Sequence, residues 1–91
     1  MTKTLLHIDQ NRLAIGTRVR LVKTVDNFPT GIFDIGLTGT LKAIEDDCWW
    51  VTLDKPFPLL AEWENAIQIW DWSLDGRRPE EHPSTYVEAA P

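Results

Sequence analysis

Hydrophobic and polar residues alternate with a period of two over most of the central part of this chain. In residues 17–23, Val19 and Leu21 share one face of an extended chain, and Arg18 and Arg20 share the other. A period of two is typical of a strand with one buried face, because successive side chains point to opposite sides of the sheet. The pattern therefore predicts a first strand here, with its two arginines in solvent.

Three more stretches show the same alternation, namely residues 40–44, 48–53 and 65–71. In the second of these, Trp49 falls on the core face together with Val51, and Trp50 falls on the opposite face. In the third, Ile69 faces the core and Trp70 therefore faces outward. Together with the first strand, these stretches predict a sheet whose inner face is lined by large apolar side chains.

Two glycines three residues apart, Gly36 and Gly39, precede the predicted strand over residues 40–44. Glycine accepts a positive φ and lets another backbone segment come close, which a sharp corner in a small barrel requires. The spacing predicts that the chain turns at this point and enters the strand at once.

The remaining connections differ in length and chemistry. Residues 24–35 contain Pro29 and Gly31, which predicts a long loop, anchored by one of three apolar side chains: Phe28, Ile32 or Phe33. Residues 45–47 are all acidic and predict a hairpin turn. Residues 59–64 predict one helical turn before the last strand.

These elements predict an all-β fold, a single small SH3-like barrel of about five antiparallel strands. The barrel would span residues 16–72, after an N-terminal lead-in over residues 1–15 that includes a candidate edge strand. Residues 73–91 hold three of the six prolines and few large apolar groups, which predicts a mobile C-terminal tail.

Composition narrows the class of protein. The chain has 91 residues, a formal charge of −5 and a single cysteine, which excludes an intrachain disulfide. Residues 1–44 carry six basic and three acidic side chains, whereas residues 45–91 carry three basic and eleven acidic ones. We find no membrane-length apolar run and no signal-peptide pattern at the N-terminus, so a cytoplasmic protein without a membrane partner is expected.

Four motifs together resemble the small SH3-like barrels: IGTRVRL (15–21), GLTGTL (36–41), WVTLD (50–54) and WENAI (63–67). One group with this pattern is the electron-transport accessory proteins, which include the photosystem I subunit that docks ferredoxin and the variable subunit of ferredoxin–thioredoxin reductase. KOW-type translation and transcription modules share the outline, and so do short bacterial and phage proteins to which no activity is attached. The resemblance implies the fold over residues 15–72, and its motifs are those of barrel geometry rather than of an activity.

The sequence offers little for catalysis. His7 and His82 lie in the lead-in and the tail, neither next to an evident nucleophile nor at metal-ligand spacing. The acidic residues 45–47 are more typical of a soluble hairpin tip than of a cation site. Cys48 lies beside three carboxylates, which raises a thiol pKa and lowers its reactivity. We therefore expect no enzyme, no catalytic residue, no cofactor and no bound metal.

The five tryptophans are the unusual feature, all of them within residues 49–72. Trp50, Trp70 and Trp72 are expected outside the core, where an uncovered indole favours association. They would be covered by the lead-in, by the tail, by a second copy or by another protein. Trp63, just before the last strand, is expected to close one end of the barrel.

Two functions of different class follow. The first is a non-enzymatic interaction or accessory module that binds a protein partner, or itself, through Trp50, Trp70 and Trp72, with Phe28 of the long loop as a further contact. The alternative is a nucleic-acid or ribosome-associated module that uses four basic side chains: Arg18, Arg20, Lys23 and Lys42. The acidic charge of the chain disfavours this alternative, because phosphate contacts supply most nucleic-acid affinity. An electron-transport accessory role is a special case of the first, and an acidic ferredoxin-like partner would disfavour it.

Overall fold

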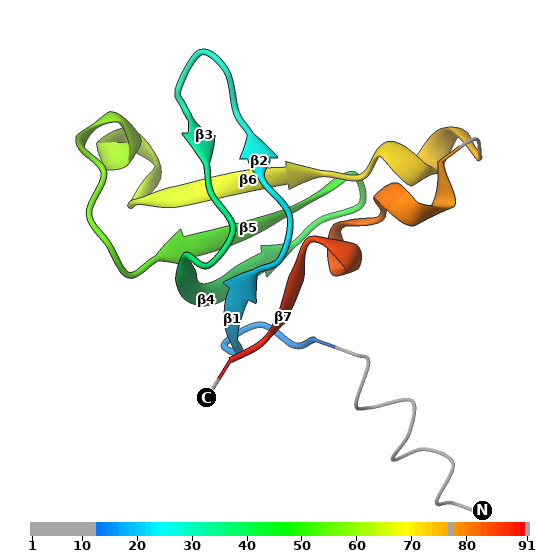
Figure 1. The fold of residues 1–91 in the computed structure, drawn as a ribbon, viewed down its shortest axis with the longest axis horizontal. Coiled ribbons are helices and arrows are strands. Elements are labelled where there is room, and N and C mark those ends of the chain that lie inside the picture. Colours follow the sequence, from blue (N-terminus) through cyan, green and yellow to red (C-terminus); the bar gives the residue numbers. More distant parts are fainter. Residues whose placement is uncertain (1–12, 77, 91) are drawn as a thin grey trace, which may run out of the picture.

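Seven strands and four short 3₁₀ helices make up the part of the chain that the computed structural model describes, residues 13–76 and 78–90. The strands are β1 (Arg18–Leu21), β2 (Val25–Asp26), β3 (Ile32–Phe33), β4 (Thr38–Ile44), β5 (Cys48–Leu53), β6 (Ala66–Trp70) and β7 (Val87–Ala89) (Figure 1). The 3₁₀ helices are η1 (Pro58–Trp63), η2 (Trp72–Asp75), η3 (Pro79–Glu81) and η4 (Pro83–Thr85). The predicted all-β class is confirmed, and the four predicted strands correspond to β1, β4, β5 and β6.

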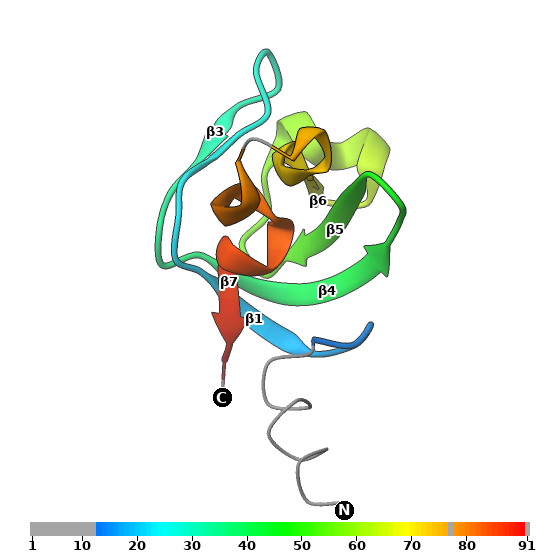
Figure 2. The same ribbon diagram turned by 90° about the vertical axis from the view of Figure 1, so that its right-hand side faces the viewer.

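Five strands form one antiparallel sheet in the order β6-β5-β4-β1-β7, and β2 and β3 form a separate hairpin. Figure 2 shows β4 as a long curved strand that joins the β5–β6 part of the sheet to the β1–β7 part. Among the described residues, β6 and β7 remain the two edges of this sheet, so its hydrogen bonding does not close into a barrel.

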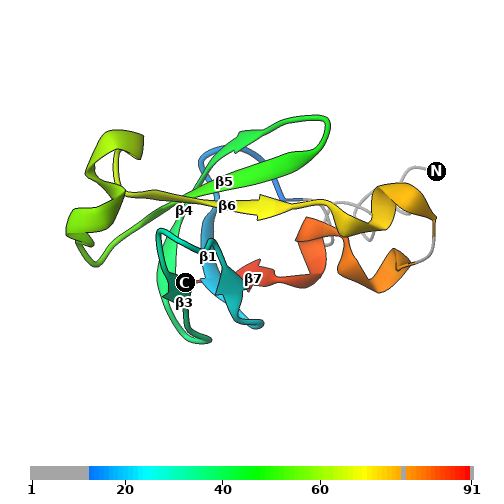
Figure 3. The same cartoon turned by 90° about the horizontal axis from the view of Figure 1, so that it is seen from above.

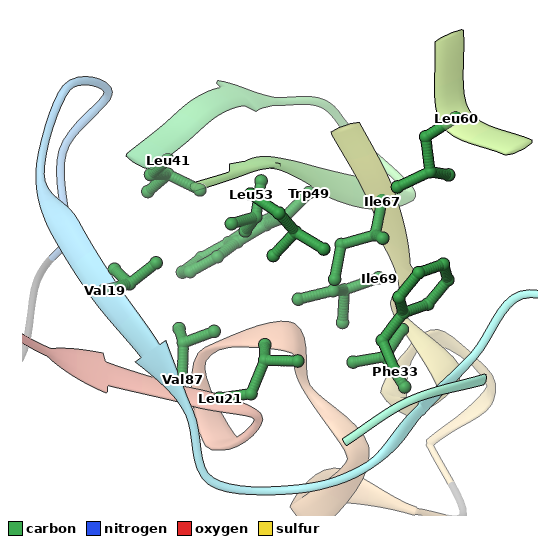
Figure 4. Close-up of a cluster of buried hydrophobic side chains, with 12 residues drawn as sticks. Val19, Leu21, Phe33, Leu41, Trp49, Leu53, Leu60, Ile67, Ile69 and Val87 are labelled. Atoms are coloured by element: carbon green, nitrogen blue, oxygen red, sulfur yellow. The ribbon is translucent and has the colours of Figure 1, made fainter. Parts of the chain in front are cut away.

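The core lies on the inner side of this curved sheet, where side chains from β1, β4, β5, β6 and β7 meet (Figure 4). The predicted alternation is confirmed: Val19 and Trp49 are buried on the core face, whereas Trp70 lies outside. Each fully buried aliphatic side chain contributes about 1.5–3 kcal/mol relative to leaving it in water. The largest completely buried aliphatic side chains are Leu21, Leu41, Leu60, Ile67, Ile69, Val19 and Val51.

Strand β4 begins at the predicted glycine corner. Gly36 has a φ of +99°, and Gly39 lies so close to β5 that a Cβ there would be 2.3 Å from the carbonyl oxygen of Thr52. One glycine therefore supplies the turn and the other the close approach, as the spacing predicts. A register shift between Leu41 and Ala43 bends β4 further along.

The prediction of a mobile tail from residue 73 is wrong. Val87 is only 5% exposed and belongs to the core, and β7 pairs with β1 in the register Leu21↔Val87. His82 packs edge-on against Trp49, with ring centroids 5.7 Å apart. The sequence pattern misses this strand because it is only three residues long and has a single buried position, too short to show a period.

The long loop is partly ordered as the β2–β3 hairpin, which in Figure 1 rises beside β6. Of its three candidate anchors, Phe33 is the one buried in the core, whereas Phe28 is 83% exposed and Ile32 is also exposed. The predicted helical turn before the last strand is η1, whose Leu60 is buried in the core. Most of the predicted lead-in lies outside the described residues, and of its described part Leu13 packs against the core.

Candidate functional site: an aromatic groove

Five aromatic side chains line one surface hollow of about 430 Å³, which we call the aromatic hollow: Phe28, Trp50, Trp63, Trp70 and Trp72. They come from separate segments, namely the hairpin tip, β5, the end of η1, the end of β6 and the start of η2. Figure 3 shows these segments from above, with β6 running between η1 and η2. The volume lies in the range that binding sites for small molecules occupy.

Pairing between β5 and β6 sets the floor of the aromatic hollow. Trp50 lies directly opposite Gln68, on the face of the sheet that is turned away from the core, and both are half-buried. The Trp50 indole Nε1 donates a hydrogen bond to Glu45 Oε1 at 3.2 Å, which fixes the orientation of the ring. Trp70, 41% exposed, follows Gln68 on the same outer face because side chains two apart share a face of the strand.

The hairpin tip is held over this floor by its own polar groups. The Asn27 side-chain amide donates to the backbone oxygen of Gln68 at 2.7 Å and accepts from the backbone N–H of Gln68 at 2.8 Å. Asp26 Oδ1 accepts from the backbone N–H of Phe28 at 2.9 Å, which is an Asx turn. Asn27 thus takes the place of a neighbouring strand at the β6 edge and keeps Phe28 beside the hollow.

A second hollow of about 330 Å³ adjoins the first, and we call it the acidic hollow. Trp50 and Trp63 line both hollows, so these two rings separate them. Three carboxylates line the acidic hollow, together with the single lysine Lys42: they are Glu45, Glu62 and Glu64. The site as a whole is a groove with an aromatic end and an acidic end.

All four residues that the sequence singles out for partner binding line the aromatic hollow: Phe28, Trp50, Trp70 and Trp72. Sequence reasoning missed Trp63, which is expected to close the barrel but lies beside Trp50 in the groove, while Leu60 of the same helix fills the core. It also missed the Asn27–Gln68 contact, because a hydrogen bond between a loop and a distant edge strand does not affect the alternation of hydrophobic and polar residues.

Comparisons with known proteins do not indicate a function. No protein-family model, curated protein or solved structure matches this chain. The function has to be argued from the groove and its surroundings. Within residues 13–76 and 78–90, no helix is long and apolar enough to cross a membrane.

The four basic residues of the nucleic-acid alternative already have partners within the chain. Arg18 donates to Asp54 Oδ1 at 2.7 Å, and this guanidinium together with the Thr38 hydroxyl holds the pKa of the Asp54 carboxyl well below its usual range. Arg20 pairs with Glu88 at 3.0 Å, and Lys42 pairs with Glu64.

Lys23, the last of these four residues, donates to the backbone oxygen of Glu80 and to Thr85 Oγ1, each at 3.0 Å, and lies over the Tyr86 ring. A phosphate would therefore have to displace a carboxylate or several local contacts at each of the four positions. Carboxylates so close to the binding groups also repel phosphate.

His82 has a hydroxyl neighbour that the sequence analysis did not predict. Ser84 Oγ lies 2.8 Å from His82 Nδ1, so a hydroxyl does lie beside this imidazole, and His82 Nε2 is 3.9 Å from Asp71 Oδ2. The same Nδ1 also accepts from the Ser84 backbone N–H at 3.1 Å, which makes His82 the N-cap of η4. Neither residue lines the aromatic or the acidic hollow. The arrangement is explained by local capping and by packing on Trp49.

Cys48 lies next to the groove in a protected position. Its thiol donates to Glu45 Oε1 at 3.3 Å and accepts from Gln68 Nε2 at 3.2 Å. Burial, with a contribution from Glu45, raises the pKa of the thiol to about 11. Asp47 completes a group of potential metal ligands whose atoms lie within 4.8 Å of one another. A thiol that stays protonated at neutral pH is a poor ligand, because metals bind the thiolate.

We expect Cys48 to react slowly with iodoacetamide at pH 8 in the folded protein. Raising the pKa by two units lowers the thiolate fraction about a hundredfold, and burial lowers access further. The measurement is the rate of mass increase by mass spectrometry, compared with the same chain in denaturant. Equal rates in the two conditions would show that Cys48 is exposed and ionises normally.

Proposed function

We propose that this chain is a non-enzymatic interaction module that binds a protein partner through the aromatic groove. The observation that carries the proposal is the convergence of five aromatic side chains from separate segments on one surface hollow. Among the described residues, Trp70 and Trp72 are left 41% and 52% exposed there, and exposed indole surface favours association with a partner that covers it. Tryptophan is also among the residues that supply most of the binding free energy at protein interfaces.

We further propose that the fold is an SH3-like barrel. Two features support this: β4, β5 and β6 form a meander after a long hairpin loop, and the last strand returns to pair with the first. In this proposal the fold includes β7 as well as the residues 15–72 that carry the sequence resemblance. An accessory role in electron transport is one form of the proposed function, and the carboxylates of the acidic hollow disfavour it for an acidic ferredoxin-like partner.

Pull-down with the folded chain as bait tests the proposed function. Trp50→Ala and Trp70→Ala should each weaken capture of the partner by about 2 kcal/mol or more, because both rings line the hollow. Each should lower the free energy of unfolding by only about 1 kcal/mol, since neither ring belongs to the core. Thermal denaturation and quantitative mass spectrometry of the captured proteins give the two values.

Ile35→Ala is the matched control, because Ile35 is an exposed apolar side chain that lines neither hollow. Proteins that wild type and the Ile35→Ala variant retain, and that both tryptophan variants lose, are the expected partners. If all baits retain the same proteins, the aromatic groove is not the binding surface.

A further inference from the structure

We propose that the partner segment bound by the groove is basic, with a lysine or arginine side chain that enters the aromatic hollow. This inference rests on the proposed function and names the chemistry of its partner. Three observations carry it: the charges around the groove, the ring faces within it, and a guanidinium that already lies over one of the same indoles.

The groove carries an excess of negative charge. Across both hollows the charged lining residues are four carboxylates and one lysine, and that lysine, Lys42, is paired with Glu64. Glu45 accepts hydrogen bonds from Trp50 and from Cys48. Asp26, Glu45 and Glu62 therefore have no cationic partner among the described residues, the first in the aromatic hollow and the other two in the acidic hollow. A basic segment lying along the groove would meet carboxylates in both hollows.

The aromatic hollow suits a cation in a second way. The face of an indole carries negative electrostatic potential, and an ammonium or guanidinium within about 6 Å of the ring centre is attracted to it. Trp72 already shows this contact, because the Arg78 guanidinium lies 5.5 Å from its ring centre. Arg78 itself does not line the hollow. The other four rings of the hollow have no contact with a cation among the described residues.

Other occupants fit the groove less well. A second copy of the chain would bring a molecule of charge −5 to an acidic surface, which electrostatic repulsion opposes. A nucleic acid would place phosphates against Asp26 and Glu62. A neutral apolar segment would cover these two carboxylates without neutralising them, and burying an unpaired charge is costly. A basic segment both covers the rings and pairs with the carboxylates.

Selection from a random dodecapeptide library displayed on phage tests this inference with the full chain as target. The selected peptides should carry net positive charge, and a synthetic copy should bind more weakly as salt is added. In NMR spectra of the labelled protein, the indole N–H signals of Trp50, Trp63, Trp70 and Trp72 should shift on binding. The indole signal of the core residue Trp49 should stay in place.

Variants that remove a charge then test whether the peptide binds through the carboxylates or through the aromatic rings alone. Asp26→Asn keeps the oxygen that accepts a hydrogen bond from the Phe28 N–H. The double variant Asp26→Asn, Glu62→Gln should bind the peptide about tenfold more weakly than wild type, as measured by calorimetry. Asp34→Asn removes the same charge from an exposed carboxylate that lines neither hollow, and it should leave the affinity unchanged.

The outcomes separate the two proposals. Selected peptides that are neutral or acidic, and that lose binding to the Trp70→Ala variant, would overturn the basic segment and leave the aromatic groove standing. Peptides that bind wild type and the Trp50→Ala and Trp70→Ala variants alike would overturn both proposals. Concentration-dependent shifts of the same indole signals without any peptide would identify a second copy as the occupant and overturn the basic segment.

Discussion

Replacing Gly39 by alanine is expected to lower the free energy of unfolding by roughly 3 kcal/mol or more. A Cβ at this position would lie 2.3 Å from the Thr52 carbonyl oxygen and 3.0 Å from a methyl carbon of Val51. The first of these atoms is backbone of the neighbouring strand β5, so it cannot rotate away as a flexible side chain would. Relief requires β4 and β5 to separate where their pairing is central to the sheet. Chemical denaturation monitored by tryptophan fluorescence measures the change.

Gly36→Ala is the informative control for this variant. Gly36 has a φ of +99° but nothing within 4 Å of its would-be Cβ, so the cost there is backbone strain alone, about 1 kcal/mol. The ranking of the two variants is the prediction: Gly39→Ala should be clearly the less stable. If both proteins unfold at the same denaturant concentration, the close approach of β4 to β5 does not exist.

Deleting residues 82–91 is expected to lower the melting temperature by tens of degrees or to prevent folding. The deletion removes β7, the buried Pro83 and the ring that packs on Trp49. It also uncovers the edge of β1, which loses its hydrogen bonds to the last strand, including Ala90 N–H to Arg18 oxygen at 2.8 Å. A loss of about 4 kcal/mol follows from the apolar burial alone, a large fraction of the stability of a domain this size.

Point variants in β7 keep the deletion interpretable. Val87→Asp places a charge in the core and should destabilise nearly as strongly as the deletion, because Val87 is 5% exposed. Glu88→Gln alters the neighbouring exposed residue, removes only a surface ion pair with Arg20, and should change stability little. A deletion variant that melts like the full chain would restore the prediction of a mobile tail.

The strand interiors could be predicted because each carries its own signal. Val19 and Leu21, or Trp49 and Val51, alternate with polar or outer residues over enough positions to define a face. β7 has no such signal: its burial depends on pairing with β1, more than sixty residues earlier in the chain. Local periodicity carries no information about which distant strand a short segment will join.

Four of the five aromatic side chains of the groove could be predicted from the sequence, but Trp63 and the shape of the groove could not. Outward positions for Trp50 and Trp70 follow from alternation, whereas Trp63 is the last residue of the 3₁₀ helix η1, whose Leu60 packs into the core. The place of Phe28 depends on Asn27, which binds both backbone groups of Gln68 across 41 residues of sequence. Neither contact has a local cause.

The amino-acid sequence by itself determined the all-β class, the inner and outer faces of the main strands, the glycine corner and the surplus of surface indoles. These properties depend on neighbours within a few residues, through side-chain alternation and backbone freedom. Only the tertiary structure decided that the C-terminal segment completes the sheet and that the surface indoles gather in one groove beside several carboxylates. It also decided that the basic residues of the first strand are neutralised by the chain's own acids. Such contacts join residues far apart in sequence, and their geometry exists only once the core has brought the strands together.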